Sequence, residues 1–305
     1  MDIRTTHVPG FKIGTAEDRE GLTGVTVFLA PEDGAAAGLD VRGCAPGTRE
    51  TDLLSPEKTV QKIHAVVLSG GSAFGLEADS GVMRYLAEQG IGFPVGDSAV
   101  PIVCGAVLFD LSIGDPHAFP DLEMGIKAAS AAGTGASVGK LTGFEHAMKS
   151  GAGYAEIILP DGLAVGTYMA VNACGEIYDQ DKILAGALAD DDRTIISSHR
   201  LMLEGYERNM GGNTSIGCII TNADLTKTEC RMVSTMAHDG LARSIRPVHT
   251  SMDGDTLFTM ASGEVKTTID TVGYLAEEAV RLAVLDAAAS AEGMGGRPAY
   301  RDIIK

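Results

Sequence analysis

The sequence contains no tryptophan and few aromatic residues of any kind: aromatic residues make up 5% of its 305 positions. Its core must therefore be built from Val, Ile, Leu, Ala and Met. No stretch approaches the roughly 20 consecutive apolar residues of a membrane-spanning helix, which excludes such a span. The first ten residues, MDIRTTHVPG, lack the apolar segment of a signal peptide. We therefore expect a cytoplasmic protein with no membrane partner.

Basic residues are also scarce. The 24 lysines and arginines are outnumbered by 41 acidic residues, so the formal net charge is −17. Binding to nucleic acid requires a basic surface that neutralises phosphates, so nucleic acid is excluded as a partner. The hydrophobic fraction of 45% is that of an ordered chain, which excludes disorder as the dominant state.

Cysteine and histidine show no metal-ligand spacing. The five cysteines are an odd number without a C-x-x-C pair, which excludes a disulfide framework and a zinc knuckle. We expect all five to be small buried side chains. The seven histidines form no H-x-x-x-H pair. The sequence therefore predicts neither a metal site nor another cofactor.

Glycine, in contrast, is abundant, with 39 residues. Glycine suits turns and places where two backbone segments approach closely. Its clusters are where we expect a functional site, and they lie at 69–75 (SGGSAFG), 133–143 (GTGASVGKLTG), 151–153 (GAG) and 211–217 (GGNTSIG).

Hydrophobic patterning predicts a layered α+β fold with helices packed outside sheets, because strands come in runs between the helices. The predicted strands are 24–30, 64–69, 154–159, 163–171, 215–222 and 256–262. Pro160-Asp161-Gly162 is typical of a hairpin turn between two of them. Apolar stripes with helical spacing predict helices over 75–89, 224–245 and 268–289.

The segment 187–212 differs from the rest because it is polar and dense in charge. It is either a surface loop, a surface helix with a flexible end, or a loop that is cut during processing. It leads directly into Asn213, Thr214 and a strongly apolar strand.

Two familiar motifs nearly match and are rejected. A phosphate-binding loop, G-x-x-x-x-G-K-[ST], would need glycine at Thr134 and a hydroxyl residue at Leu141. A nucleophile elbow, G-x-S-x-G, fails because the last glycine after Ser72 comes one position too late, at Gly75.

Thr214 is the residue whose context points to chemistry. A threonine hydroxyl is a weak nucleophile unless a base lies beside it, and the α-amine of an N-terminal threonine is such a base. An α-amine titrates near pH ~7.7–8, so it can accept and return a proton at neutral pH. The amine appears only if the bond after Asn213 is cut, and Gly211 and Gly212 give the backbone the freedom this requires. On spacing alone, an ordinary turn before a strand has the same pattern.

Four segments in order resemble the DmpA/nylon-oligomer-hydrolase family of self-processing peptidases, which is related to ornithine acetyltransferase. They are Leu68-Ser-Gly-Gly-Ser-Ala-Phe-Gly-Leu-Glu-Ala78, Gly135-Ala-Ser-Val-Gly-Lys140, the junction at Asn213-Thr214 followed by SIGCIITN, and His249-Thr-Ser-Met-Asp-Gly-Asp-Thr-Leu-Phe258. Asn172, in Ala-Val-Asn, also stands where this family has an asparagine at a strand end. The resemblance covers most of the chain.

The resemblance implies a precursor that cuts itself between Asn213 and Thr214. The products would be an α-chain, 1–213, and a β-chain, 214–305, that remain together in one domain spanning 1–305. The implied fold is the four-layer αββα sandwich of N-terminal-nucleophile hydrolases, in the DmpA/ornithine acetyltransferase topology. The implied assembly is a homotetramer.

The resemblance also implies roles for five residues, each of which has an ordinary structural alternative. Thr214 would be the nucleophile rather than a strand-start threonine. Lys140 would keep the amine neutral and support the oxyanion, rather than being a solvated loop lysine. Asn172 would donate its amide to the oxyanion, rather than form a turn. Asp253 and Asp255 would orient the threonine, sharing one face if the chain is extended there, unless Gly254 forms a tight turn.

The substrate pocket is less defined. Gly70, Gly71 and Ser72 are candidates for its lining, and a close-packed turn is the equal alternative. Phe109 stands where the nylon-hydrolase branch has a tyrosine, so one hydroxyl donor is missing here.

The predicted function is therefore hydrolysis of amide bonds by a self-processed threonine hydrolase. Its substrate would be a short linear amide, such as a 6-aminohexanoate oligomer, or a small peptide cleaved by aminopeptidase action. Acyl transfer to an amine is the second enzymatic alternative. A non-catalytic binding protein on the same fold is the third, and the intact set of five residues argues against it.

Overall fold

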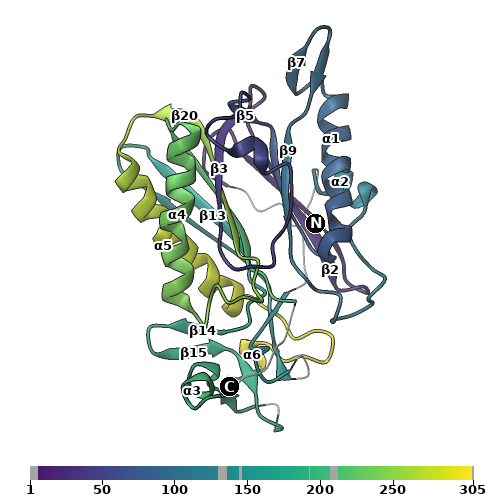
Figure 1. The fold of residues 1–305 in the computed structure, drawn as a ribbon, viewed down its shortest axis with the longest axis vertical. Helices are drawn as coiled ribbons and strands as arrows, with labels where there is room; N and C mark the ends of the chain where they lie inside the picture. The colour runs from purple at the N-terminus through teal and green to yellow at the C-terminus, as the bar shows by residue number, and fades with distance from the viewer. Residues whose placement is uncertain (1–5, 130–135, 144–145, 192, 207–211, 304–305) are drawn as a thin grey trace.

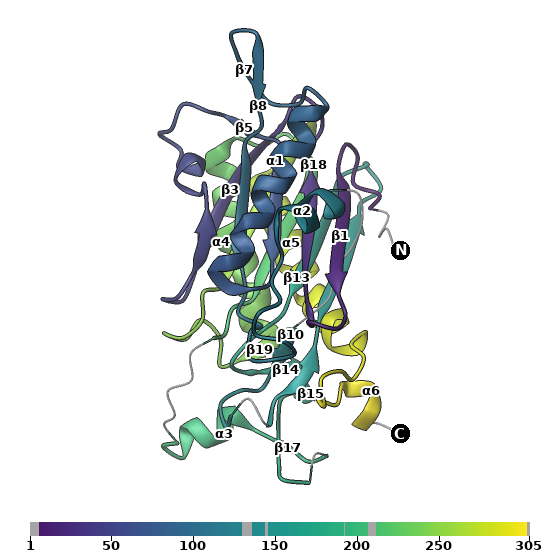
Figure 2. The same ribbon diagram turned by 90° about the vertical axis from the view of Figure 1, so that its right-hand side faces the viewer.

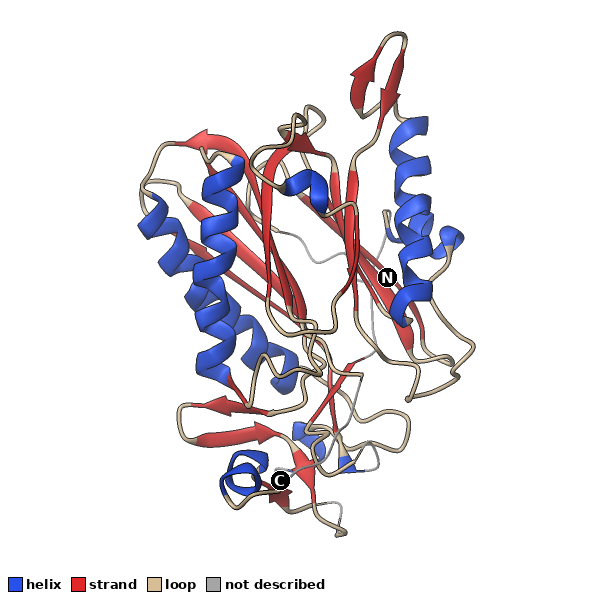
Figure 3. Cartoon of the chain, in the orientation of Figure 1, coloured by secondary structure: helices blue, strands red, loops and turns tan. Residues whose placement is uncertain are grey.

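The computed structural model describes residues 6–129, 136–143, 146–191, 193–206 and 212–303. Two β-sheets pack face to face at its centre, and helices cover the outer side of each sheet (Figures 1 and 3). In the view of Figure 1, the order from left to right is helix, sheet, sheet, helix. This arrangement confirms the predicted αββα sandwich.

The first sheet has the strand order β1-β2-β6-β9-β4. Only β6 and β9 run parallel within it. Its strands are β1 (Lys12–Asp18), β2 (Thr23–Leu29), β6 (Ala65–Ser69), β9 (Val103–Val107) and β4 (Gly47–Arg49).

The second sheet has the strand order β12-β13-β18-β20-β3-β5, and only β18 and β20 run parallel within it. Its strands are β12 (Ala152–Ile158), β13 (Ala164–Ala170), β18 (Ile216–Ala223), β20 (Thr256–Val265), β3 (Ala35–Val41) and β5 (Lys62–Ile63). The turn between β12 and β13 is the predicted one: Gly162 has φ +91°, and the Asp161 carboxylate accepts the Leu163 N–H at 3.1 Å.

Helices α1 (Ala78–Glu88) and α2 (Leu122–Ala128) cover the first sheet, while α4 (Lys227–Ser244) and α5 (Ile269–Ala289) cover the second (Figure 1). Each helix is amphipathic and buries its apolar stripe against a sheet. Between the sheets lies a third apolar layer, which includes Phe28, Leu68, Ile220 and Phe258. Burying each such side chain stabilises the fold by about 1.5–3 kcal/mol.

Smaller elements complete the chain. The β7–β8 hairpin projects at one end of the molecule, and α3 lies at the other (Figures 1 and 2). These elements are η1 (Asp52–Leu54), η2 (Ser72–Glu77), β7 (Phe93–Val95), β8 (Ser98–Val100), β10 (Ala136–Val138), β11 (Met148–Ser150), β14 (Glu176–Asp179), β15 (Lys182–Ala185), β16 (Ala187–Leu188), β17 (Ile195–Ile196), α3 (Ser198–Leu203), β19 (Ile245–Arg246) and α6 (Tyr300–Ile303).

All six predicted strands and all three predicted helices are present, with shifted ends. The helix predicted from 224 begins at Lys227, because Thr226 and Glu229 form a capping box there. The helix predicted from 75 begins as η2 and becomes α-helical only at Ala78. The segment 187–212 contains β16, β17 and α3, and its residues 192 and 207–211 lie outside the described part of the chain.

One expectation about cysteine is wrong. Cys44 is exposed, in the loop after β3, while the other four cysteines are buried as predicted. In the described part of the chain, no helix combines the length and apolarity needed to cross a bilayer.

Candidate active site

Strand polarity brings the predicted site residues to one edge of the second sheet. Thr214 lies just before β18, and Asp255 lies just before β20. Because these strands are parallel neighbours, their starting ends meet at the same edge. Asn172 follows the end of β13, which runs antiparallel to β18 and so finishes at that edge too.

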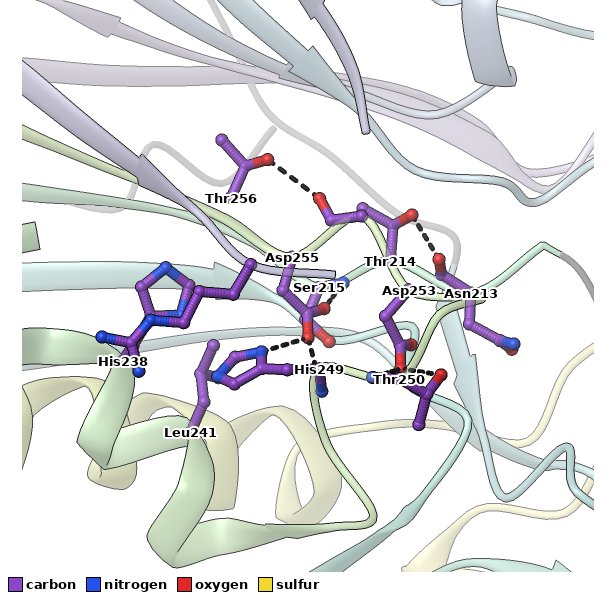
Figure 4. Close-up of polar contacts among 12 residues, drawn as sticks. Asn213, Thr214, Ser215, His238, Leu241, His249, Thr250, Asp253, Asp255 and Thr256 are labelled. Atoms are coloured by element: carbon purple, nitrogen blue, oxygen red, sulfur yellow. Dashed lines mark hydrogen bonds and ion pairs between the residues drawn. The ribbon is translucent and has the colours of Figure 1, made fainter. Parts of the chain in front are cut away.

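Thr214 is buried in the intact chain, with 5% of its surface exposed. Its backbone N–H donates to the carbonyl oxygen of Asn172 at 3.0 Å. Its hydroxyl donates to the carbonyl oxygen of Asn213, the residue just before it (Figure 4). The hydroxyl therefore lies against the carbonyl group of the bond that self-cleavage would break.

Lys140 is completely buried, which excludes the alternative of a solvated loop lysine. Its ammonium donates to the backbone carbonyl of Asn172 at 3.1 Å and also to the side-chain oxygen of that residue. Burial lowers the pKa of Lys140 to about 7, although the nearby charges of Asp253 and Asp110 oppose the shift. At neutral pH, both the charged and the neutral amine are therefore populated.

Asn172 is also fully buried, and it connects several backbone segments. Its amide nitrogen donates to the carbonyl of Phe109 at 2.8 Å and to that of Gly212 at 3.5 Å. Its side-chain oxygen accepts the Lys140 ammonium and the Ser137 N–H, the latter at 3.4 Å. In the intact chain, the amide thus joins Gly212, next to the junction, to Phe109.

Asp253 and Asp255 are each 1% exposed. A turn closes between Thr250 and Asp253 instead of at Gly254, and Asp253 forms a β-bridge with Asn213. One carboxylate oxygen of Asp253 accepts the N–H and the hydroxyl of Thr250 at 2.9 and 2.6 Å. The other, Oδ1, is buried without a hydrogen-bond partner among the described residues. Burial, and then the charge of Asp255, raise the pKa of Asp253.

Two of the pocket candidates, Gly71 and Ser72, lie in a tight turn, and a third, Gly70, lines a small cavity. Gly71 N–H donates to the Asp110 carboxylate at 2.7 Å, and Gly71 and Ser72 both have positive φ, so they form a close-packed turn. Gly70 also lines a cavity of about 30 Å³ between the two sheets, which Asp110 lines as well. That volume holds about one water molecule and is too small for a substrate.

Phe109 lies beside the junction. A β-carbon added to Gly212 would be 2.5 Å from the Phe109 ring, so this glycine is in direct contact with it. The Phe109 carbonyl accepts the Asn172 amide, so the residue contributes through its backbone whether or not it carries a hydroxyl.

Comparison with known proteins identifies the family. Residues 4–301 match the profile of "Peptidase family S58". The chain belongs to this family. The resemblance to this family that was inferred from the sequence motifs is therefore confirmed. Membership of the family supports hydrolysis of amide bonds as the activity.

Relatives of this S58 family member carry two kinds of name. This chain is 40% identical over 313 residues to an uncharacterised aminopeptidase of Mycobacterium leprae, and the match covers 91% of this chain and 85% of the relative. It is 31% identical over 279 residues to the 6-aminohexanoate-oligomer endohydrolase of Kocuria sp., covering 84% of this chain and 74% of the relative.

Solved structures show the same fold. The PH0078 protein of Pyrococcus horikoshii superposes with a TM-score of 0.67 at 20% identity, covering 96% of this chain and 88% of that protein. The L-aminopeptidase D-Ala-esterase/amidase of Ochrobactrum anthropi, described as a variant of the Ntn hydrolase fold, also gives 0.67, at 17% identity, covering 95% and 87%. The S58 family member therefore has the Ntn hydrolase fold.

Sequence reasoning missed the residues that support the two aspartates. His249 Nδ1 lies 2.8 Å from Asp255, and Thr250 holds Asp253. Both stand in the same short segment as the aspartates, so proximity in sequence was the available signal. Within the described ranges, no three His, Cys, Asp or Glu side chains are grouped as ligands of a metal ion.

Proposed function

We propose that this S58 family member is a self-processing amide hydrolase and that Thr214 is its nucleophile. The observation that carries the proposal is the contact between the Thr214 hydroxyl and the Asn213 carbonyl. Gly212, with φ +95°, supports it because the chain takes a conformation there that residues with a side chain rarely adopt.

The proposed self-cleavage has two steps. Thr214 Oγ attacks the carbonyl carbon of Asn213, the C–N bond breaks, and the hydroxyl proton passes to the departing nitrogen. Asn213 is then held as an ester on Oγ, and Thr214 has a free α-amine. Water hydrolyses the ester, which leaves Asn213 with a carboxyl group and returns the Thr214 hydroxyl.

Catalysis would repeat this chemistry on a substrate. The α-amine takes the hydroxyl proton as Oγ attacks the substrate carbonyl, and it returns a proton to the leaving amine. Lys140 and Asn172 would support the oxyanion. If the new chain end at Asn213 moves away after cleavage, the Asn172 N–H that now donates to the Gly212 carbonyl becomes free for the oxyanion.

The two aspartates would orient the new N-terminus. The Asp253 Oδ1 atom is buried and lacks a hydrogen-bond partner among the described residues, so an α-ammonium nearby would satisfy it. No cofactor enters this mechanism. In the proposal, residues 1–213 and 214–305 stay together after cleavage, in a cytoplasmic tetramer.

The proposed substrates are small peptides cleaved at the N-terminus, because relatives that are 39–40% identical are named aminopeptidases. The endohydrolase relative favours short linear amides such as 6-aminohexanoate oligomers as the second class. A screen that pairs aminoacyl anilides with 6-aminohexanoate oligomers separates the two. Adding a free amine acceptor and analysing the products separates hydrolysis from acyl transfer.

The deciding experiment is the intact mass of the purified protein under denaturing conditions, with Thr214→Ala as the matched variant. We expect two fragments that meet between Asn213 and Thr214, absent from the variant. A single species of 31.6 kDa in both samples would overturn self-processing.

A further inference from the structure

We propose that His249 is a positioning residue for the nucleophile segment. It holds the Asp255 carboxylate so that this carboxylate holds the backbone of Ser215, which directly follows Thr214. The inference rests on the proposed function, because it concerns how Thr214 is placed for attack.

A series of hydrogen bonds links His249 to Ser215 through Asp255. The His249 ring nitrogen Nδ1 lies 2.8 Å from Asp255 Oδ2, and the His249 backbone N–H donates to the same oxygen at 3.3 Å. The other oxygen of Asp255, Oδ1, accepts the Ser215 N–H at 2.7 Å (Figure 4). One carboxylate therefore connects the histidine to the peptide group between Thr214 and Ser215.

The hydrogen bonds between His249, Asp255 and Ser215 are largely shielded from water. Asp255 is 1% exposed and the His249 side chain 16% exposed, so water competes little for the carboxylate. A carboxylate accepts hydrogen bonds, so the inference requires a proton on His249 Nδ1. The other ring nitrogen, Nε2, is buried without a hydrogen-bond partner among the described residues.

A second histidine fixes the ring from the other side. The His238 ring meets the His249 ring edge to face, with centroids 4.8 Å apart (Figure 4). His238 Nε2 lies 3.1 Å from the carbonyl oxygen of Asp40, which holds the His238 ring from β3. Burial lowers the pKa of His238 to about 4, so this ring is neutral near neutral pH. His249 therefore packs against an uncharged ring that orients it.

The backbone of His249 also has a positive φ angle. Its φ is +55°, in the left-handed region that few residues other than glycine adopt, although histidine and asparagine occur there more often than most. Such a conformation persists only where the surrounding structure imposes it, and it often marks a functional position. Here it aims both the backbone N–H and the ring of one residue at the same carboxylate.

These features define the test. In His249→Asn, the amide nitrogen replaces Nδ1 as donor and the residue tolerates positive φ. In His249→Gly, the backbone is equally tolerated but the donor is lost. Gln180→Gly is the control, because Gln180 has the same φ of +55° and is exposed.

Self-cleavage would be followed by mass after refolding each precursor from urea. We expect His249→Gly to slow it about 100-fold, since a small displacement of a reacting group has that effect. We expect His249→Asn to stay within about 5-fold of the unmodified chain, and Gln180→Gly to match it. In processed enzyme, the loss should appear in kcat with KM little changed.

The outcomes are separable. If the unmodified chain cleaves and His249→Gly cleaves equally fast, the inference is overturned and the proposed function stands. If the unmodified chain never cleaves, the proposed function falls and the inference falls with it.

A second measurement covers the case in which His249→Gly does not fold. The nitrogen NMR shifts of histidine-labelled Thr214→Ala precursor report which ring nitrogen carries the proton, and His249→Asn assigns the signal. We expect a proton on Nδ1. A ring with its only proton on Nε2 would overturn the inference.

Discussion

Lys140 and Thr214 donate to a single oxygen atom, the backbone carbonyl of Asn172. The Lys140 ammonium lies 3.1 Å and the Thr214 N–H 3.0 Å from it. The Lys140 ammonium and the backbone of the proposed nucleophile are thus joined through one carbonyl oxygen. We therefore expect the charge of Lys140 to affect the reaction at the bond between Asn213 and Thr214.

Lys140→Met should slow self-cleavage about 10²–10³-fold, the effect of losing one oxyanion donor. In the unmodified chain the rate should fall as pH rises through about 7, because the pKa of Lys140 lies there and its cation is lost. The variant should lack this fall. The measurement is the cleavage rate of precursor refolded between about pH 5.5 and about pH 9.

Lys149 is the matched control for this prediction. It is also buried, and its ammonium donates to the carbonyls of Ala136 and Ser150. Its charge lowers the pKa of Lys140, so in Lys149→Met the fall in rate should move to higher pH. A rate that rises through pH 7 in the unmodified chain would instead make the neutral Lys140 amine a base.

Gly212→Ala should slow self-cleavage about 10-fold or more, because the added carbon meets the Phe109 ring and the backbone has a positive φ. Gly162→Ala is the matched control: its φ is +91°, and nothing lies within 4 Å of an added β-carbon. It should lose about 1–2 kcal/mol of stability without slowing cleavage. Equal cleavage rates in both variants would show that the Phe109 contact plays no part.

Asp79→Asn should stabilise the protein at alkaline pH. Asp79 is 1% exposed, and burial raises its pKa to about 7, against the opposing charge of Arg49. Between its unfolded pKa of 3.8 and about 7 the folded state binds the extra proton, so stability falls as pH rises through this range. We expect a gain of about 1–3 kcal/mol at about pH 8 that disappears near about pH 4.

Urea unfolding in a Thr214→Ala background, which keeps one chain, measures this difference. Asp97→Asn is the control, because Asp97 is exposed in the β7–β8 hairpin. A gain of equal size at both pH values would mean that the carboxyl charge is not its source.

Cys44 should be the one thiol that reacts quickly in the folded protein, since it alone is exposed. Burial raises the pKa of Cys174 to about 11 and raises the pKa of Cys104, Cys218 and Cys230 still further, which leaves little thiolate. A colorimetric thiol assay should count one group in native protein and five in denaturant. Cys44→Ser should abolish the native signal; a remaining fast thiol would contradict the assigned burial.

Sequence patterns located the elements whose signals are local. The turn at Pro160-Asp161-Gly162 was predicted because each residue favours it, and α4 and α5 were predicted because their apolar stripes repeat with helical period. Strand β3 was missed, because three alanines and a glycine give it little strand propensity. It forms through pairing with β20, and Gly38 lets the α4 backbone approach, since an added β-carbon would lie 2.3 Å from Arg231 N.

The sequence by itself determined the layered α+β fold class, because hydrophobic patterning is a local signal. It also predicted the residues of the proposed chemistry, through the resemblance of several short segments to a known family. Only the tertiary structure decided that Thr214, Asn172 and Asp255 meet, since this follows from the pairing of β13, β18 and β20. It likewise decided that Lys140 is buried and that His249 holds Asp255. Burial, pKa and hydrogen-bond partners arise from segments far apart in the chain, and local propensity carries no information about them.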